Sequence, residues 1–242
     1  MAKYLYKLGY DIIITAREEG KLEELKSELQ MTNNSQIVHV ITADLSDEKQ
    51  VLNLYEEIRN KFKNIDVVIN NAGFGLFGKF VQTDLQTELN MIHTNVIAVH
   101  MLTKLFLQDM VLKDSGRILN VASVAGFMPG PLMTTYYSTK NYVFRMSEAI
   151  NKELKKMNSN VKISVLCPGP VNTNFNNVAK VKFNLRQASS EKIAKYAIDK
   201  MLKNKFKIIP GIDIKIARFG SKILPDSILA EICYHMQERK NR

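Results

Sequence analysis

Short apolar runs alternate with longer helical patterns along most of this chain. The runs lie at residues 11–15, 36–42, 66–69, 117–121, 161–166 and 206–209. The helical patterns lie at 18–29, 47–62, 86–112, 135–156 and 191–204, after an opening helix at 2–8. Apolar runs without alternation are typical of strands that are covered on both faces. The pattern therefore predicts an α/β fold, a doubly wound parallel sheet with right-handed crossovers.

Polar or conformationally special residues follow five of these predicted strands. They are Arg17, Asp44, Asn71, Ser123 and Pro168. In open parallel sheets, ligands bind beyond the carboxyl ends of the strands. We therefore expect these residues to converge on one edge of the sheet and to form a binding site there.

Composition fits one domain that spans residues 1–242. A hydrophobic content of 45% and a charged content of 24% are ordinary for a globular protein. The two cysteines, Cys167 and Cys233, give neither a metal-ligand spacing nor a disulfide framework. Since this usage fits a reducing compartment, we expect no metal and a cytoplasmic location.

The net charge of +10 bears on the partners of the chain. The lysines are spread over many predicted helices, which favours a phosphate-bearing small molecule over a nucleic acid. No apolar run approaches the roughly 18 residues of a membrane-spanning helix. The basic tail, residues 212–242, is partly amphipathic, but Gly220 and Pro225 interrupt it. We therefore expect no peripheral membrane contact.

Tyr136 and Lys140 stand four residues apart in the helix predicted at 135–156. Residues at this spacing lie on one face of a helix, so the phenol and the ammonium can share a pocket. A nearby cation favours the phenolate, and we expect it to lower the pKa of Tyr136 from about 10. A proton donor to a carbonyl needs such a pKa near neutral pH.

Several motifs along the chain resemble those of the short-chain dehydrogenase/reductase family and follow one another in that family's order. Asn70-Asn71-Ala72-Gly73 is similar to its Asn-Asn-Ala-Gly signature. Asn95, Ser123 and Tyr136-x-x-x-Lys140 follow at compatible spacings. The loop at 167–173 resembles its Pro-Gly loop, and the match runs from about Gly9 to Thr173.

The resemblance implies a catalytic role for four residues. Tyr136 would give a proton to the carbonyl oxygen or take it from the alcohol, and Lys140 would lower the pKa of Tyr136 and bind the nicotinamide ribose. Ser123 would polarise the substrate oxygen. Asn95 would hold a water that links Lys140 to solvent. Tyr137 stands three residues from Lys140 and does not fit the motif.

The resemblance also implies the residues that bind the cofactor. These are Arg17, Asp44, Asn71, Ala72, Gly73, Tyr136, Lys140, Pro168, Gly169, Val171 and Thr173. Relatives that prefer NAD carry an acid at the end of the first of these strands. Here Ala16 and Arg17 stand there, and a guanidinium suits a 2′-phosphate. We therefore expect NADP rather than NAD.

Residues 73–78 fit the Gly-x-Gly-x-x-Gly fingerprint of dinucleotide sites but follow the third predicted strand. That fingerprint should open a helix in the first βαβ unit. We therefore interpret this segment as a flexible wall of the substrate cleft.

The only indication of the substrate comes from apolar residues that flank the motif of Tyr136 and Lys140. They are Phe74, Phe77, Phe80, Phe127, Met128 and Met133. Residues 219–225 loosely resemble the C-terminal region of 11β-hydroxysteroid dehydrogenases and 3-ketoacyl reductases. The resemblance implies a small apolar ketone or aldehyde, or the corresponding alcohol.

The chain departs from the family pattern at its start. The family opens with a central strand and a glycine-rich phosphate loop, whereas Met1–Leu5 resembles the middle of the helix beyond that loop. We therefore expect a truncated chain, with roughly twenty more residues in the functional protein. A structure should show a gap or an abnormal pairing between the strands at 11–15 and 66–69. Two alternatives stay open, a cofactor-impaired binding or scaffold protein and a peripheral membrane protein. The resemblance also implies a homo-oligomer for the full-length form.

Overall fold

The structure is a computed structural model that describes residues 1–32, 35–172 and 188–238. Thr173, one of the expected cofactor contacts, lies outside the described residues. Helices and strands alternate as the sequence predicts, and the predicted α/β class is confirmed. The described elements, with η1 a π-helix and η2 a 3-10 helix, are α1 (Ala2–Lys7), β1 (Ile12–Ala16), α2 (Glu19–Thr32), β2 (Val38–Thr42), α3 (Glu48–Lys61), β3 (Val67–Asn70), α4 (Leu85–Ile92), η1 (His93–Ile97), α5 (Ala98–Leu112), β4 (Arg117–Val121), η2 (Val124–Phe127), α6 (Thr134–Lys156), β5 (Lys162–Leu166), β6 (Val171–Asn172), β7 (Ala188–Ser189), α8 (Ser190–Leu202), β8 (Lys207–Ile208), α9 (Ile212–Ile223) and α10 (Asp226–Glu238).

Parallel pairing builds the sheet in separate pieces. The larger piece has the strand order β3-β4-β5-β8, with Val67 opposite Arg117 and Arg117 opposite Lys162. A second piece contains β1 and β2, and a short pair contains β6 and β7. All of these pairs are parallel, as expected for a sheet whose crossovers are helices.

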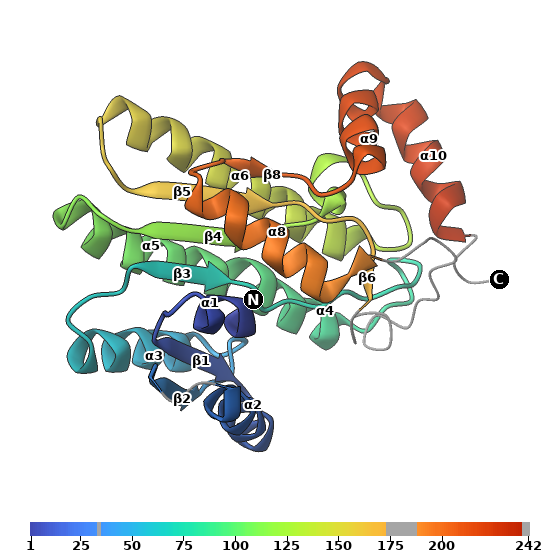
Figure 1. Ribbon diagram of the computed structural model, residues 1–242. Helices are drawn as coiled ribbons and strands as arrows, with labels where there is room; N and C mark the ends of the chain where they lie inside the picture. Colours follow the sequence, from blue (N-terminus) through green and yellow to red (C-terminus); the bar gives the residue numbers. More distant parts are fainter. Residues whose placement is uncertain (33–34, 173–187, 239–242) are drawn as a thin grey trace.

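A gap separates β1 from β3, and it confirms the expectation for these two strands. Within the described chain, β1 pairs with β2 alone and β3 with β4 alone. Figure 1 shows α1 beside this gap, next to β1, and α8 over the four-stranded piece, and the two helices contact each other. Leu5 and Tyr6 of α1 share a core with Ile12 of β1 and Leu119 of β4. Side-chain packing, rather than strand pairing, thus connects the two pieces.

The opposite face is covered by α3 and α5. Leu54 and Ile58 of α3 pack against Leu102 and Phe106 of α5 in a second core cluster. The continuous helical stretch Leu85–Leu112 is long and apolar enough to cross a membrane, so the expectation of no such run was wrong. Its residues Ala98, Leu102 and Phe106 are buried, because the helix packs against α3 and the sheet. That packing is typical of a core helix.

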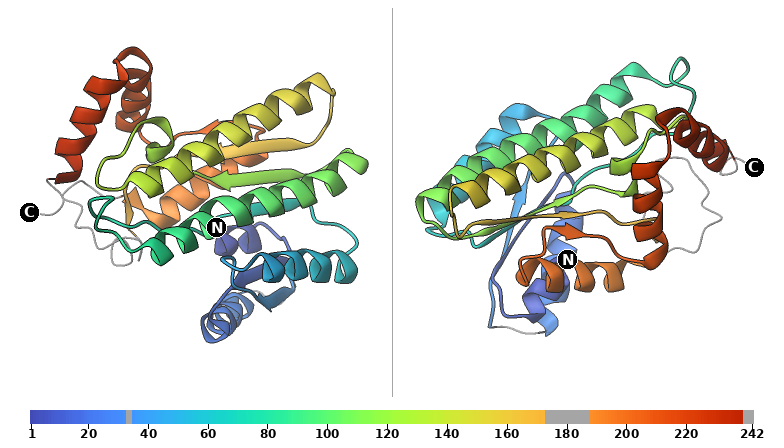
Figure 2. Two further views of the ribbon diagram at one scale, coloured as in Figure 1. Left: turned by 180° about the vertical axis from the view of Figure 1, so that it is seen from behind. Right: turned by 90° about the horizontal axis from the view of Figure 1, so that it is seen from above.

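The tail forms two helices where the sequence predicted an interrupted segment. Gly220 lies within α9, and Pro225 stands between α9 and α10. In both views of Figure 2, α9 and α10 stand at one end of the molecule, near the carboxyl ends of the strands. The tail therefore helps to enclose the edge at which the candidate site lies.

Candidate active site

One cavity of about 750 Å³ lies at the carboxyl edge of the four-stranded sheet. It brings together most of the residues that the sequence singles out. Those that line it are Asn71, Gly73, Ser123, Tyr136, Lys140, Pro168, Gly169 and Val171. Asn95 lies directly beneath it, whereas Arg17, Asp44 and Ala72 do not line it. The expected convergence is thus present for Ser123, Tyr136 and Lys140.

Tyr136 lies in the first turn of α6, and its side chain and that of Ser123 both line the cavity. Burial raises the pKa of Tyr136 to about 12, although the nearby Ser123 side chain acts in the opposite direction. The expected lowering of this pKa is therefore wrong. Removal from water disfavours the phenolate, and no neighbouring charge outweighs that cost.

Lys140 is 5% exposed, and its ammonium donates a hydrogen bond to the carbonyl oxygen of Val121 at 2.9 Å. The Nζ atom lies 5.9 Å from the centre of the Tyr136 ring. Burial lowers the pKa of Lys140 to about 8, so charging this amine inside the protein is costly. Tyr136 and Lys140 share the pocket as expected, with the ammonium over the Tyr136 ring.

Asn95 lies in the π-helix η1, and its side chain is fully buried. Its Oδ1 accepts from the backbone N–H of Phe74 at 3.1 Å, and its Nδ2 donates to the Phe74 carbonyl at 2.9 Å. Nδ2 also donates to the Thr139 hydroxyl at 3.1 Å. Single π turns inside α-helices are frequent at functional sites. Asn95 therefore connects the segment after β3 to α6.

Gly73 stands where no side chain would fit. A Cβ atom here would lie 2.8 Å from Oδ1 of Asn95 and 3.2 Å from Nζ of Lys140. The first distance is shorter than real Cβ contacts, so a neighbour would have to move. The glycine thus lets the backbone pass close to Lys140 and leaves room beside it for a ligand.

Tyr137, the local competitor of Tyr136, has a structural position. It is 9% exposed, and its hydroxyl accepts a hydrogen bond from Nε2 of Gln237 in α10. Its ring leaves no space for a side chain at Gly130, where a Cβ would lie 2.0 Å from the ring. Tyr137 therefore connects α6 to the tail, which supports the choice of Tyr136.

The segment at 73–78 forms a wall, as expected. Gly73 and Phe74 line the cavity, and the Gly78 N–H donates to the Leu132 carbonyl at 2.8 Å. Of the other apolar residues, Met128 and Met133 line the cavity, and Phe77 packs beside them. Phe127 belongs to a core cluster and Phe80 is exposed, so neither is part of the wall.

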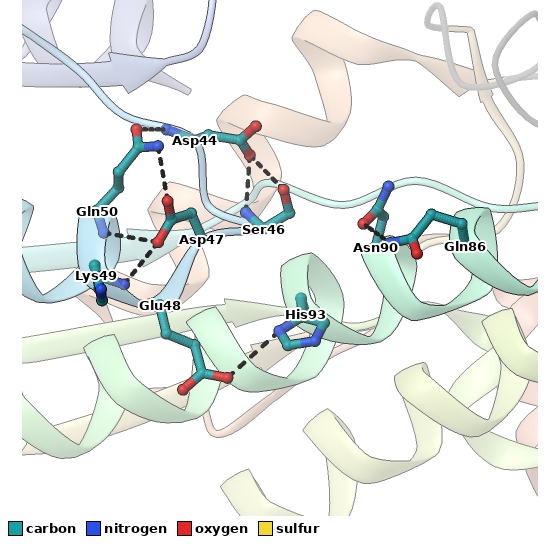
Figure 3. A network of polar contacts seen from close by, with 9 residues as sticks. All are labelled: Asp44, Ser46, Asp47, Glu48, Lys49, Gln50, Gln86, Asn90 and His93. Carbon is teal, nitrogen blue, oxygen red and sulfur yellow. Dashed lines mark hydrogen bonds and ion pairs between the residues drawn. The ribbon is translucent and has the colours of Figure 1, made fainter.

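Asp44 and Arg17 lie at the edge of the two-stranded sheet. Figure 3 shows the Asp44 carboxylate held by Ser46, whose N–H and hydroxyl donate to it at 2.9 and 2.7 Å. Burial alone would raise the pKa of Asp44, but these bonds and the charge of Arg17 lower it below the ordinary value. Gln50 connects the Asp44 backbone to Asp47, the N-cap of α3. Arg17 itself is exposed.

A buried polar network beneath the cavity was missed by the sequence analysis. Nδ2 of Asn70 donates to Asn120 Oδ1 at 2.8 Å and to the Thr103 hydroxyl at 3.0 Å. Nδ2 of Asn120 donates to the Ser147 hydroxyl at 3.0 Å. The network thus joins β3, β4, α5 and α6. Its signal in the sequence is a polar residue, Asn120, inside an apolar run.

Asn141, next to Lys140, was also missed. Its Nδ2 lies 3.0 Å from the Ala125 carbonyl, 3.2 Å from that of Met128 and 3.0 Å from that of Tyr137. The first two carbonyls belong to the segment that follows Ser123. Asn141 thereby fixes this segment to the helix that carries Tyr136. Nothing in the local sequence indicates this role, since Ala125 and Met128 lie outside the helix that carries Asn141.

Comparison with known proteins identifies the family. The sequence profile of a family described as "short chain dehydrogenase" matches residues 1–182. The chain belongs to the short-chain dehydrogenases. It is an oxidoreductase of the carbonyl–alcohol type, and a nicotinamide cofactor is supported at the level of the family.

Curated relatives match over most of the chain. The human protein "Dehydrogenase/reductase SDR family member 11" is 28% identical over 198 residues, which are 80% of this chain and 74% of that protein. An uncharacterized oxidoreductase of Schizosaccharomyces pombe is 31% identical over 177 residues, 69% of this chain and 54% of that protein.

Solved structures show the same fold. A short-chain dehydrogenase from Sphingobium yanoikuyae, in complex with NADPH, matches with a TM-score of 0.81 at 23% identity. The match covers 93% of this chain and 91% of the chain in that structure. One from Burkholderia phymatum, in complex with NAD, also has a TM-score of 0.81, at 21% identity, covering 90% and 86%. The sheet of this chain is thus a variant of a shared architecture.

Proposed function

We propose that this short-chain dehydrogenase uses NADP to interconvert a carbonyl and an alcohol on a small apolar molecule. Asn95, Ser123, Tyr136 and Lys140 are the catalytic set. The observation that supports this proposal most strongly is that Ser123, Tyr136 and Lys140 line the same apolar cavity, with Ser123 near enough to the phenol to lower its pKa. Two hydroxyl groups on one cavity wall provide a donor pair for one carbonyl oxygen.

The substrate oxygen would lie between Ser123 and Tyr136. The Ser123 hydroxyl donates to that oxygen and polarises the carbonyl. The Tyr136 hydroxyl then transfers its proton to the same oxygen as negative charge develops there. Because the resting pKa of Tyr136 is about 12, the phenol keeps its proton until the reaction creates a stronger base.

Lys140 supplies the positive charge that the phenolate needs after proton transfer. Its bond to the Val121 carbonyl holds the amine at the cavity wall, beside Gly73. Asn95 forms hydrogen bonds with Phe74 and Thr139, and these bonds fix the part of the cavity next to Lys140. Asn95 also stands where a water between it and Lys140 would carry a proton toward solvent. These groups prepare the site before the substrate binds.

The residues present fit the nicotinamide end of the cofactor. Bound NADPH would supply the hydride. The cavity is lined by Asn71, Gly73, Lys140, Pro168, Gly169 and Val171. The expected set also includes Ala72, which does not line the cavity, and Thr173, which lies outside the described residues. The close approach at Gly73 is the observation that favours a ligand here.

Arg17 and Asp44 would bind the adenosine end. Asp44 presents a carboxylate fixed by Ser46, and Arg17 is an exposed cation near it. Within the part of the chain that the structure describes, no hydrogen bond or ion pair engages the Arg17 guanidinium. It is therefore free to pair with a 2′-phosphate, which supports NADP over NAD.

The test is NADPH-dependent reduction of a panel of apolar ketones and aldehydes, compared with NADH. We expect Tyr136→Phe to lower kcat by about 100-fold or more, because only the proton donor is removed. The matched control is Tyr137→Phe, which removes the neighbouring hydroxyl and should stay within about threefold of wild type. Equal losses in the two variants would contradict the assignment of Tyr136.

The alternative is a binding or scaffold protein with impaired cofactor use. The gap between β1 and β3 is the observation that favours it, because strand edges there lack pairing. A fluorescence titration with NADPH separates the two functions. No binding of NADPH, or binding without turnover of any carbonyl in the panel, would favour the alternative. Turnover would exclude it. Assembly into a homo-oligomer and a cytoplasmic location stay predictions.

A further inference from the structure

A second cavity, of about 850 Å³, adjoins the catalytic one. Met128, Ser221 and Leu229 line both cavities. Its walls come from η2, α6, β8, α9 and the start of α10. We call it the basic pocket, after the four cations that line it: Arg145, Lys207, Arg218 and Lys222. None of these residues belongs to the catalytic set.

Three of these cations surround one buried aromatic ring. The centre of the Phe144 ring lies 5.2 Å from the Arg218 guanidinium carbon, 5.4 Å from Lys207 Nζ and 5.5 Å from the Arg145 guanidinium carbon. Arg218 is also 4.5 Å from the centre of the Phe127 ring. Contacts of this kind are favourable and orient the cation on the ring face. The rings thus hold the charges in place before any ligand arrives.

The carboxylates of the pocket do not balance these cations. Glu148 accepts from Arg145 at 2.8 Å and from Lys207 at 2.6 Å, so one acid serves two bases. Arg218 forms no hydrogen bond or ion pair with any residue in the described ranges. Burial, and then the charge of Arg145, lower the pKa of Arg218. An anion bound at Arg218 would offset both the burial of its guanidinium and the repulsion from Arg145.

The excess of charge is small and localised. Four cations face two carboxylates in the lining, Glu148 and Asp226. A phosphate monoester carries a charge of about −1.5 to −2 near pH 7, which matches that excess. The planar fork of a guanidinium also suits the oxygens of a phosphate group. Ser221, Ser227 and Asn141 add polar groups to the same wall.

We propose that the basic pocket binds the phosphate group of a phosphate monoester, with Arg218 as its main partner. The phosphate would belong either to the far end of a substrate in the catalytic cavity or to a separate small ligand. The first source rests on the proposed function, and the second does not. The shared lining residues make both geometrically reasonable, and the experiment distinguishes them.

The direct test is calorimetric titration with inorganic phosphate at constant ionic strength, with chloride as the reference anion. We expect Arg218→Gln to weaken phosphate binding by about tenfold or more, because a charged hydrogen-bond donor is lost. The matched control is Lys215→Gln on the same helix, since Lys215 is exposed and lies outside the pocket lining. No binding by the wild type, or equal binding by Arg218→Gln, would overturn the proposal.

A second variant keeps the proposal testable if Arg218→Gln fails to fold, since Arg218 packs on Phe127 and Phe144. Lys222 lines the pocket from an exposed position, so Lys222→Gln should fold normally. We expect it to weaken phosphate binding by about threefold. If Arg218→Gln fails to fold, unchanged binding by Lys222→Gln overturns the proposal by itself.

Kinetics then identify the source of the phosphate. We compare kcat/KM for an apolar aldehyde with and without a terminal phosphate, in the wild type and in Arg218→Gln. An advantage of the phosphorylated substrate that disappears in the variant assigns the pocket to the substrate. Binding of inorganic phosphate without that advantage assigns it to a separate ligand. A failure of the proposed function would abolish turnover but leave the titration readable.

Discussion

The two pieces of the sheet carry opposite halves of the expected site, and they are built differently. The strand ends of the four-stranded piece lead into Ser123 and the Pro168 loop, above buried side chains that are joined by hydrogen bonds. The two-stranded piece presents Arg17 and Asp44 at a half-exposed edge. Chemistry needs atoms that are held in place, whereas recognition of a flexible adenosine tolerates adjustable side chains. We therefore expect changes to the first piece to have larger effects than changes to the second.

The largest effect is expected at Gly73, in the segment that follows the four-stranded piece. Gly73→Ala would place a methyl group 2.8 Å from Asn95 Oδ1 and must displace Asn95 or Lys140. Small misplacements of catalytic groups cost about 100-fold, and we expect that loss in kcat/KM. Gly20→Ala in α2 is the matched control, because a Cβ there meets nothing within 4 Å. Retention of activity by Gly73→Ala would show that this close approach is not needed.

The next effect is on stability and comes from the buried network. Asn120→Ala removes one buried partner of the Asn70 amide and one of the Ser147 hydroxyl, which keep their bonds to Thr103 and Val143, and we expect a cost of about 1–3 kcal/mol. For a domain of this size, Tm should fall by about 2–4 °C per kcal/mol. Differential scanning calorimetry measures this shift. The exposed Asn53→Ala on α3 should change stability by less than about 0.5 kcal/mol. An Asn120→Ala protein as stable as that control would refute the role of the network.

A smaller effect is expected from pH. Burial lowers the pKa of Lys140 to about 8, so this amine loses its charge as the pH rises through that value. The charge favours the phenolate of Tyr136, and kcat/KM for reduction should therefore fall above pH 8. We expect a decrease of about tenfold between pH 7 and pH 9. Lys140→Arg keeps its charge over this range, and its profile should be flat, whatever its absolute rate. A wild-type profile as flat as that of the variant would rule out Lys140 as the titrating group.

The smallest effect is expected from the two-stranded piece. Arg17→Ala should lower the ratio of kcat/KM for NADPH to that for NADH by about fivefold to tenfold, because solvent weakens an exposed charge pair. The ratio is measured with one carbonyl substrate under fixed salt. Lys21→Ala, in the following helix, controls for general loss of positive charge. An unchanged ratio in Arg17→Ala would remove the argument for NADP.

The sequence predicted the order of the elements well, because buried strands and amphipathic helices have different periods. It also predicted that Ser123, Tyr136 and Lys140 lie in one cavity, since each follows or opens an element at the same sheet edge. The gap between β1 and β3 followed from the family pattern, not from the residues alone.

Properties that depend on packing could not be predicted in the same way. The pKa of Tyr136 rises rather than falls because burial outweighs the distant Lys140, and burial depends on the whole fold. The tail was expected to be interrupted, yet Gly220 lies inside α9, where the helix packs beside the cavity. Two of the three carbonyls around Asn141, those of Ala125 and Met128, come from residues that are close only after folding.

The position of Asn141 has a mechanical consequence. Its amide holds the backbone after Ser123 to the first turns of α6, so Ser123 and Tyr136 move as parts of one rigid body. The three carbonyls that Asn141 binds lie outside α9 and α10, so a change in the position of these two helices would leave the spacing of the two hydroxyls unaltered. In the proposed reaction, substrates of different bulk would thereby meet the same pair of donors.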